Sequence, residues 1–225
     1  MSDLAAATSP QTVGADLVLV PVGSIEQHGA HLPLDTDSVI ARAVADRLAT
    51  ELADAWVAPV VSYGSSGEHQ SFPGTCSVGT EALRVLLVEL VRSIRCWARR
   101  VVLVNGHGGN LAAVRGAVER LRADGHDVGW VPCVAEGVDL HAGHAETSLM
   151  LHLAPWSVRC ELAKPGNMAS LTEILPAMRA GGVAAVSANG VLGDPSRATA
   201  TQGALLLERM VARALHDLQG SGTYP

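Results

Sequence analysis

Aromatic and charged side chains are scarce in this sequence. Of its 225 residues, 3% are aromatic and 17% are charged, whereas 48% are hydrophobic. A chain of this length and composition can bury a large core without disulfide bonds or structural metals, and that core must consist mainly of Ala, Val and Leu. We expect a single α/β domain over residues 1–225, in which the small and polar residues 1–14 are flexible.

Cysteine is also sparse. The four cysteines lie at long and irregular intervals, and no two of them form a C-x-x-C pair. This spacing argues against a zinc ribbon and against a small disulfide-bonded fold. We therefore expect reduced and buried thiols at Cys76, Cys96, Cys133 and Cys160.

The sequence shows no basic run, no signal peptide and no membrane-spanning stretch. Its formal net charge is −6, which disfavours nucleic acid and anionic membranes as partners. Residues 1–16 lack the basic start and apolar segment of a signal peptide, and no apolar run is long enough to cross a bilayer. We expect a cytoplasmic protein.

Apolar runs alternate with segments of helical periodicity along the chain. This alternation predicts an α/β fold with a mostly parallel sheet flanked by helices on both faces. Two segments are expected to lack regular structure, the Gly- and Ser-rich loop 63–79 and residues 165–200. The expected strands are 17–22, 57–61, 101–105 and 127–134, and the expected helices are 38–52, 81–98, 111–122, 141–153 and 202–217.

The segment GSIEQHGAHLPLDTD (23–37) directly follows the first expected strand. Glu26 and His28 are two residues apart, so in an extended segment their side chains point to the same side. A carboxylate and an imidazole that converge suit Zn²⁺, Fe²⁺ or Mn²⁺. Asp37, at the start of a helix, is a third candidate ligand. A polar surface loop is the alternative for this segment taken alone.

A second segment, VVLVNGHGGN (101–110), places His107 just beyond a buried strand, where the sites of α/β proteins form. The glycines around it, including Gly108, allow close approach to the backbone. A phosphate-binding loop is disfavoured, because the segment lacks both the Lys-Ser/Thr pair of a P-loop and the G-x-G-x-x-G spacing. A Gly-rich turn with an incidental histidine is the alternative.

Two further segments carry histidine. In HAGHAETS (141–148), Glu146 lies at the entry of a helix, where it is either a ligand or a helix cap. His141 and His144 are additional donors there, and in GEHQSFPGT (67–75) His69 is either a substrate contact or a packed loop residue. Three histidines in helical or turn contexts are expected to be ordinary polar residues: His126, His152 and His216.

Taken together, these segments place carboxylates and histidines after several strands. Such a set is sufficient for two metal ions that share one bridging carboxylate. No G-x-S-x-G motif is present, so a serine nucleophile is disfavoured.

The run GSIEQHGAHLPLDTD, followed by NGHGGN and HAGHAETS, resembles the creatininase family of amidohydrolases over roughly residues 15–216. The resemblance implies a three-layer fold and a homo-oligomer, with a hexamer favoured. It also implies that Glu26, Asp37 and His107 bind one metal. His28, the bridging Asp37 and an acidic residue would bind the second.

One position departs from the creatininase pattern. Creatininase has a glutamate two residues after the histidine of its N-G-H motif, where this sequence has Gly109. Glu146 is then the remaining candidate for the fifth ligand. The resemblance also implies that His141 shuttles protons near the substrate.

Further motifs, GSSGEHQ (64–70) and GGVAAVSANGVLGDP (181–195) among them, resemble a peptidase subgroup of this family. Its members release a modified C-terminal Val-Tyr unit from a ribosomally made precursor peptide. This resemblance implies Fe²⁺ and Zn²⁺ as the two cofactors, with Mn²⁺ as an alternative. The expected substrate contacts are His69, Gly108 and His144. The alternatives are a hydrolase of a small cyclic amide or formamide and a non-catalytic metal-binding scaffold.

Overall fold

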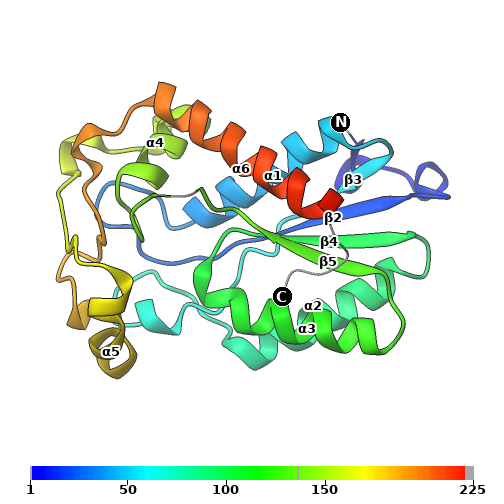
Figure 1. Cartoon of the computed structure of the whole chain (residues 1–225), viewed down its shortest axis with the longest axis horizontal. Helices are drawn as coiled ribbons and strands as arrows, with labels where there is room; N and C mark the ends of the chain where they lie inside the picture. The colour runs from blue at the N-terminus through cyan, green and yellow to red at the C-terminus, as the bar shows by residue number, and fades with distance from the viewer. Residues whose placement is uncertain (1, 136, 221–225) are drawn as a thin grey trace.

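A five-stranded parallel sheet forms the centre of the protein, in the order β1-β3-β2-β4-β5. The computed structural model in Figure 1 describes residues 2–135 and 137–220. The strands are β1 (Ser2–Asp3), β2 (Leu17–Val22), β3 (Ala55–Val57), β4 (Arg100–Asn105) and β5 (Val128–Pro132). The predicted parallel α/β sheet is therefore confirmed.

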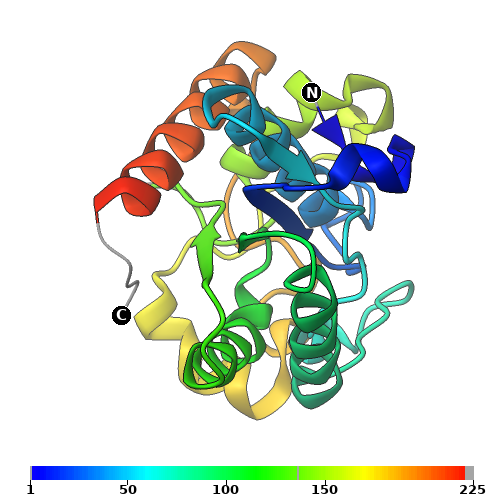
Figure 2. The ribbon, with the colours of Figure 1, turned by 90° about the vertical axis from the view of Figure 1, so that its right-hand side faces the viewer.

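Helices cover both faces of the sheet and make a three-layer fold, as Figure 2 shows end-on. One face carries α1 (Thr36–Glu51), α4 (His144–Leu153) and α6 (Ala200–Gly220). The other carries α2 (Thr80–Ile94) and α3 (Leu111–Ala123). In the described part of the chain, the one α-helix that covers neither face, α5 (Leu171–Gly181), lies beyond the carboxyl ends of the strands in Figure 1. Within the described ranges, no helix is long and apolar enough to cross a membrane.

Successive strand residues supply two separate hydrophobic cores. In β4, Val102 and Val104 pack with α1, α4 and α6, whereas Val101 and Leu103 pack with α2 and α3. Because side chains alternate across a strand, a strand covered on both faces must be apolar at every position. This explains why β2 and β4 read as continuous apolar runs.

Two segments contain regular structure that was not predicted, and the expectation that residues 165–200 lack it is wrong. Within residues 1–14, which stay a predicted flexible segment, β1 pairs with β3 and two short 3₁₀ helices form. The segment 165–200 contains α5, whose first turn is held by a capping box between Ser170 and Glu173. Pro176 inside that helix hides its periodicity in the sequence.

The expectation of buried cysteines also fails. All four thiols are free, but Cys76, Cys96 and Cys160 are exposed and only Cys133 is partly buried. Cys76 lies in the long loop, Cys96 follows the end of α2, and Cys160 lies in a short 3₁₀ turn. The two cores are filled by aliphatic side chains from other parts of the chain.

Candidate metal centre

The carboxyl ends of β2 and β4 place two of the histidine segments side by side. The strands are neighbours with Val22 paired to Asn105, and the Gly106 N–H donates to the Val22 carbonyl over 2.8 Å. A Cβ at Gly106 would lie 2.5 Å from the carbonyl oxygen of Asp37. Glycine at this position therefore lets the end of β4 approach the first turn of α1, and His107 comes to lie beside Asp37.

Two asparagines of the NGHGGN motif hold the loops in place. Asn110 donates to the Gly23 carbonyl over 2.9 Å and accepts from the Ser65 N–H over 2.8 Å. Asn105 donates to the His107 carbonyl over 2.8 Å. Three loops are thus tied together by amide side chains that are themselves buried.

Four of the expected ligands form one buried cluster. His107 lies 3.1 Å from Glu26 through Nε2 and 3.1 Å from Asp37 through Nδ1. His28 Nε2 lies 3.2 Å from Asp37 Oδ1. None of the four side chains is more than 6% exposed. Asp37 lies between the two histidines, as a bridging carboxylate requires.

Glu146 reaches the same cluster from the first turn of α4. Its Oε2 accepts from the Ala142 N–H over 2.6 Å and lies 3.7 Å from His28 Nε2. The backbone at Ala142 has a φ of 51°, a conformation that costs a non-glycine residue free energy. This strained turn links His141 to the helix that carries Glu146. Glu146 therefore lies beside His28, and its hydrogen bond goes to Ala142, which precedes the helix.

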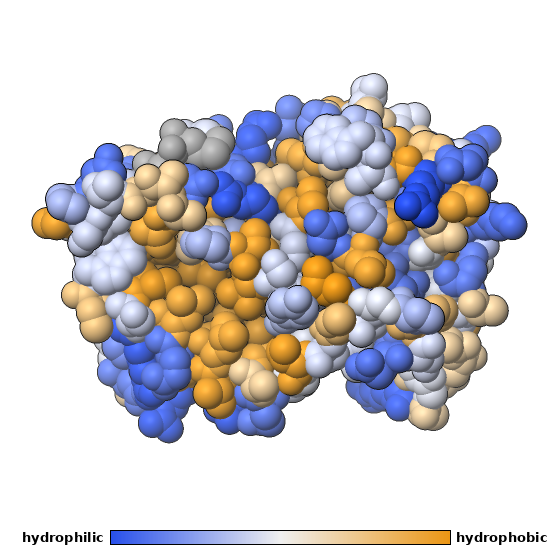
Figure 3. Space-filling model, turned by 180° about the vertical axis from the view of Figure 1, so that it is seen from behind, coloured by the Kyte–Doolittle hydropathy of each residue, from blue (hydrophilic) through white to orange (hydrophobic). Residues whose placement is uncertain are grey.

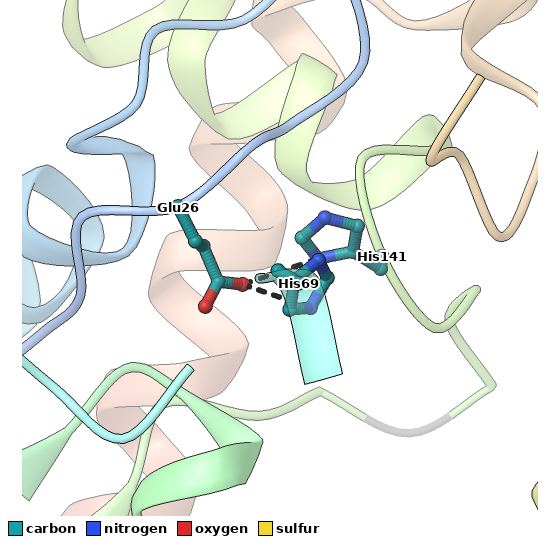
Figure 4. A group of neighbouring side chains, drawn as sticks. All are labelled: Glu26, His69 and His141. Atoms are coloured by element: carbon teal, nitrogen blue, oxygen red, sulfur yellow. Dashed lines mark ion pairs between the residues drawn. The ribbon is translucent and has the colours of Figure 1, made fainter. Parts of the chain in front are cut away.

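His69 and His141 lie inside the cluster, next to Glu26. Figure 4 shows both rings beside the Glu26 carboxylate, with His69 Nε2 3.3 Å and His141 Nδ1 3.7 Å from Glu26 Oε1. Gln27, which the sequence analysis passed over, joins them: its Nε2 lies 2.8 Å from His69 Nδ1 and 3.1 Å from His141 Nε2. His141 Nε2 also donates to the Gln27 carbonyl over 2.8 Å, so Nδ1 faces the cluster.

The charges of the cluster shift the pKa values of its members strongly. Burial raises the pKa of both Glu26 and Glu146 to about 7. Burial alone would lower the pKa of His28, but the carboxylates of Asp37, Glu146 and Glu26 together outweigh burial and raise that pKa to about 10. Burial lowers the pKa of His69 to about 4 and holds that of His141 well below its usual range.

The chemistry of the donor set fits divalent metal ions. Three groups of His, Asp and Glu have ligand atoms within 4.8 Å of one another. Neither oxygen of the buried Glu26 carboxylate has a hydrogen-bond partner among the described residues. Burying such an anion is costly unless a cation compensates it. The groups are Glu26–His28–Asp37, His28–His141–Glu146 and Glu26–His69–His141.

Gly109 makes room for a carboxylate that the sequence analysis did not single out. A Cβ at Gly109 would collide with Glu68 Oε1, His107 Nε2 and the Ser65 carbonyl oxygen. Glu68 Oε1 itself lies 3.4 Å from His107 Nε2, and the side chain is 31% exposed. The Glu68 carboxylate thus occupies the space that a side chain at position 109 would need. Its place directly before His69 in the GEHQ motif is the sequence signal.

A cavity of about 430 Å³ opens above the cluster. Asp37, His107, His141 and Glu146 line it together with Gly108, whose contact with substrate stays a prediction. His144 does not line this cavity but a neighbouring one. Its backbone N–H is bound by Asp139, which caps α4. His126, His152 and His216 lie outside both cavities.

Known proteins resemble the chain over almost its full length. Residues 5–218 match the family described as creatininase, creatinine amidohydrolase. The chain is 53% identical over 221 residues to the mycofactocin precursor peptide peptidase of Mycobacterium tuberculosis (strain CDC 1551 / Oshkosh), covering 94% of this chain and 88% of that protein. It is 34% identical over 172 residues to the creatinine amidohydrolase of Pseudomonas putida, covering 63% and 66%. A mutant creatininase of the Zn-Zn type has a TM-score of 0.79 at 27% identity, with 97% of both chains covered.

Proposed function

The chain belongs to the creatininase family, and we propose that it is the peptidase of mycofactocin precursor peptide maturation. It hydrolyses the amide bond that joins a modified C-terminal Val-Tyr unit to the rest of the precursor and thereby releases that unit. The mycobacterial relative that carries the name of this peptide supports the substrate class. The Val-Tyr unit itself follows from the resemblance of the sequence motifs.

The observation that carries the proposal is the position of the acidic and histidine cluster. Ligand-type side chains from four separated segments converge at the carboxyl end of the sheet, and a cavity opens directly above them. A non-catalytic metal-binding scaffold needs no such cavity. The cavity has the size of small-molecule sites and is walled by leucines, so it suits a compact, aromatic leaving unit.

We assign the ligands by combining the resemblance with the contacts. Glu26, Asp37 and His107 hold one ion, and His28, Asp37 and Glu146 hold the other, with Asp37 shared between them. When bound, two such ions would lower the pKa of water towards neutrality and would act as Lewis acids on the scissile carbonyl. Fe²⁺ and Zn²⁺ are the proposed pair, with Mn²⁺ as the alternative, since all these donors are oxygen or nitrogen.

The side chains must also move one proton. Water adds its oxygen to the carbonyl carbon, the C–N bond breaks, and the leaving nitrogen gains a proton from that water. We assign the transfer to His141, whose Nδ1 faces the cluster while Nε2 is bound to the Gln27 carbonyl. Its lowered pKa keeps the ring neutral at pH 7, so Nδ1 first accepts the proton and then donates it.

Hydrolysis of the modified precursor tests the proposal directly. Purified protein loaded with Fe²⁺ and Zn²⁺ is incubated with modified or unmodified precursor peptide, and products are read by mass spectrometry. We expect release of the modified unit and little cleavage of the unmodified peptide, because a site built around one hydrogen-bonding pattern rejects analogues that leave its groups unpaired. No cleavage of either peptide, with metals bound, contradicts the assignment.

Hydrolysis of a small cyclic amide is the second candidate. The creatinine amidohydrolase of P. putida supports it, as does a cavity large enough for such a molecule. Creatinine and a formamidopyrimidine are therefore included in the same assay. Turnover of either, with the precursor untouched, favours this candidate. The absence of any metal-dependent hydrolysis favours the non-catalytic scaffold.

We further propose a cytoplasmic homo-oligomer, with a hexamer favoured. Figure 3, which shows the molecule from behind, has a broad apolar area on the half that holds the amino ends of the strands, with hydrophilic residues at its rim. A contiguous apolar surface of this kind is typical of protein–protein interfaces. Sedimentation velocity measures the number of subunits, and a monomer at micromolar concentration contradicts this part of the proposal.

A further inference from the structure

A second cavity lies beside the one above the metal cluster. Its volume is about 780 Å³, against about 430 Å³ for the first. Leu140, Leu171 and Leu192 line both cavities. Because the same side chains bound both spaces, the two cavities are adjacent compartments with these leucines at their border. We call the larger cavity the outer groove.

Leu140 and Leu192, which form the wall between the two compartments, are bonded to the backbone next to the metal cluster. His141 and Leu192 form an antiparallel bridge, in which the Leu192 N–H donates to the His141 carbonyl over 2.8 Å. The Leu140 N–H donates to the Leu192 carbonyl over 3.0 Å. His141 points its ring into the cluster, whereas Leu140 lines both cavities and is 41% exposed. A chain that crosses this wall therefore passes His141.

The outer groove gathers exposed apolar side chains from three parts of the chain. Met168, which precedes α5, is 72% exposed, and Leu205 on α6 is 52% exposed. In Figure 1 these segments border the carboxyl end of the sheet. Apolar side chains concentrated in a hollow are typical of a binding site. Polar side chains lie among them: Arg209 offers donors, Asp194 offers acceptors, and His144 and Gln202 offer both.

We propose that the outer groove binds the part of the substrate peptide that lies N-terminal to the scissile bond, as an extended and largely apolar segment. The inference rests on the proposed peptidase function. The inner cavity has room for the compact released unit, and the outer groove, which shares Leu140, Leu171 and Leu192 with it, has room for the remainder of the peptide. The groove adjoins the Leu140–Leu192 wall, and its mixed donors and acceptors suit a peptide backbone.

Two substitutions place a charge in the groove without touching the metal cluster. Leu205→Glu and Met168→Glu change side chains that are already exposed, so the fold should tolerate them. Val85→Glu is the matched control, because Val85 also lies on a helix, is 53% exposed and does not line the groove. Each variant is given the full modified precursor and a truncated peptide that keeps only the modified unit and the residue before it.

We expect each of the two groove variants to raise KM for the full precursor about tenfold or more, because a central apolar contact is lost. The kcat of each variant should stay within about twofold of the wild-type value. The truncated peptide should be cleaved equally by all proteins. Binding of a labelled precursor that lacks its Val-Tyr unit, measured by fluorescence anisotropy, should weaken by the same factor in both groove variants and remain unchanged in Val85→Glu.

An unchanged KM and unchanged anisotropy in both groove variants overturn the inference. A shift in subunit number caused by Leu205→Glu or Met168→Glu, seen by size-exclusion chromatography, also overturns it, because a second copy of the chain then occupies the groove. If the wild type cleaves neither peptide, the proposed function fails. The anisotropy measurement still decides whether the groove binds this peptide segment.

Discussion

The metal cluster and the hydrophobic cores both contain fully buried side chains, yet they are held together by opposite kinds of interaction. Leu103 in the core against α2 and α3 and Glu26 in the cluster both have no exposed surface. Burial of the first stabilises the fold by about 1.5–3 kcal/mol, because its surface leaves water. Burial of the second is unfavourable and raises the pKa of its carboxyl group to about 7. The apolar residues along the sheet therefore stabilise the fold, whereas the buried charged residues at its carboxyl end destabilise it.

This contrast explains the composition of the cluster. Opposite charges offset one another around Asp37, whose pKa is held well below its usual range because His28 and His107 outweigh the effect of burial. Divalent cations would replace the protons on these imidazoles and remove the cost of burying the glutamates. We therefore expect substitutions in the cluster to alter metal content and activity, and substitutions in the cores to alter stability alone.

The largest expected effect is that of Asp37→Ala. Loss of the shared carboxylate should abolish activity and lower metal affinity by more than the roughly 10- to 100-fold that outer-shell groups contribute. Metal content by mass spectrometry and hydrolysis of the modified precursor measure both. Asp35→Ala, two residues earlier at an exposed position without a capping bond, is the control and should behave like the wild type. Full metal content in Asp37→Ala contradicts the bridging role.

His141→Ala should separate catalysis from metal binding. If His141 moves the proton, its loss should lower kcat by about 10²- to 10⁴-fold while both ions remain bound. His107→Ala, by contrast, should lose metal and activity together, because His107 contacts both Glu26 and Asp37. Loss of metal from His141→Ala would instead make His141 a ligand, as its place in two of the ligand groups allows.

The positions of His107 and His141 differ in how well the sequence alone predicts them. Strands β2 and β4 were predictable because both faces are covered, so that residues 17–22 and 101–104 form continuous apolar runs. Since their carboxyl ends must meet in a parallel sheet, the approach of Glu26 to His107 was predictable as well. The approach of His141 was not, because no local pattern states where a loop after β5 returns. The family resemblance supplied that placement.

The residues that were missed show a second limit. Helix α5 escaped notice because Pro176 interrupts its pattern, although Ser170 and Glu173 spell a capping box. The contacts of Gln27 with His69 and His141, and that of Glu68 with His107, join residues that are distant in sequence. A side chain whose role is to connect two loops has no periodicity, so its contacts emerge only from the folded structure.

A core substitution tests the other side of the comparison. Leu103→Ala should lower the free energy of unfolding by about 2–5 kcal/mol, the cost of a lost apolar side chain plus the cavity that it leaves. Urea denaturation measures this loss. The folded variant should retain wild-type metal stoichiometry, because Leu103 faces away from α1 and α4. A loss of metal from the folded variant would show that core and cluster are coupled.

Adjacent glycines provide a finer test at the border between the two regions. Gly109→Ala places a Cβ against the Glu68 carboxylate, His107 and the Ser65 carbonyl, so we expect a loss of about 1–3 kcal/mol and weaker metal binding. Gly108→Ala is the control, since no atom lies within 4 Å of the added Cβ. Thermal unfolding with and without metal separates the two effects. Equal behaviour of both variants contradicts the view that Glu68 needs the space at position 109.

The smallest effect concerns pH and isolates a single carboxyl group. The pKa of Glu26 is raised from 4.5 to about 7 by burial, so its contribution to stability in the metal-free protein is fully present below about 4.5 and is lost as pH rises through about 7. Glu26→Gln removes this titration. From pH 5 to 8, the unfolding free energy of the wild type should therefore fall relative to that of Glu26→Gln, by at most about 1.4 kcal/mol per pH unit.

Added metal should reverse the sign of that trend in the wild type. Metal ions bind the deprotonated carboxylate, so they should stabilise the wild type more as pH rises, and the Gln variant much less. Glu119→Gln, at an exposed position on α3, is the control and should leave both curves unchanged. Urea titrations of metal-free and metal-loaded protein at several pH values supply the data. A parallel pH dependence of wild type and Glu26→Gln without metal would mean that Glu26 is stabilised as an anion by the histidines alone, and the cluster would then need no cation to offset its burial.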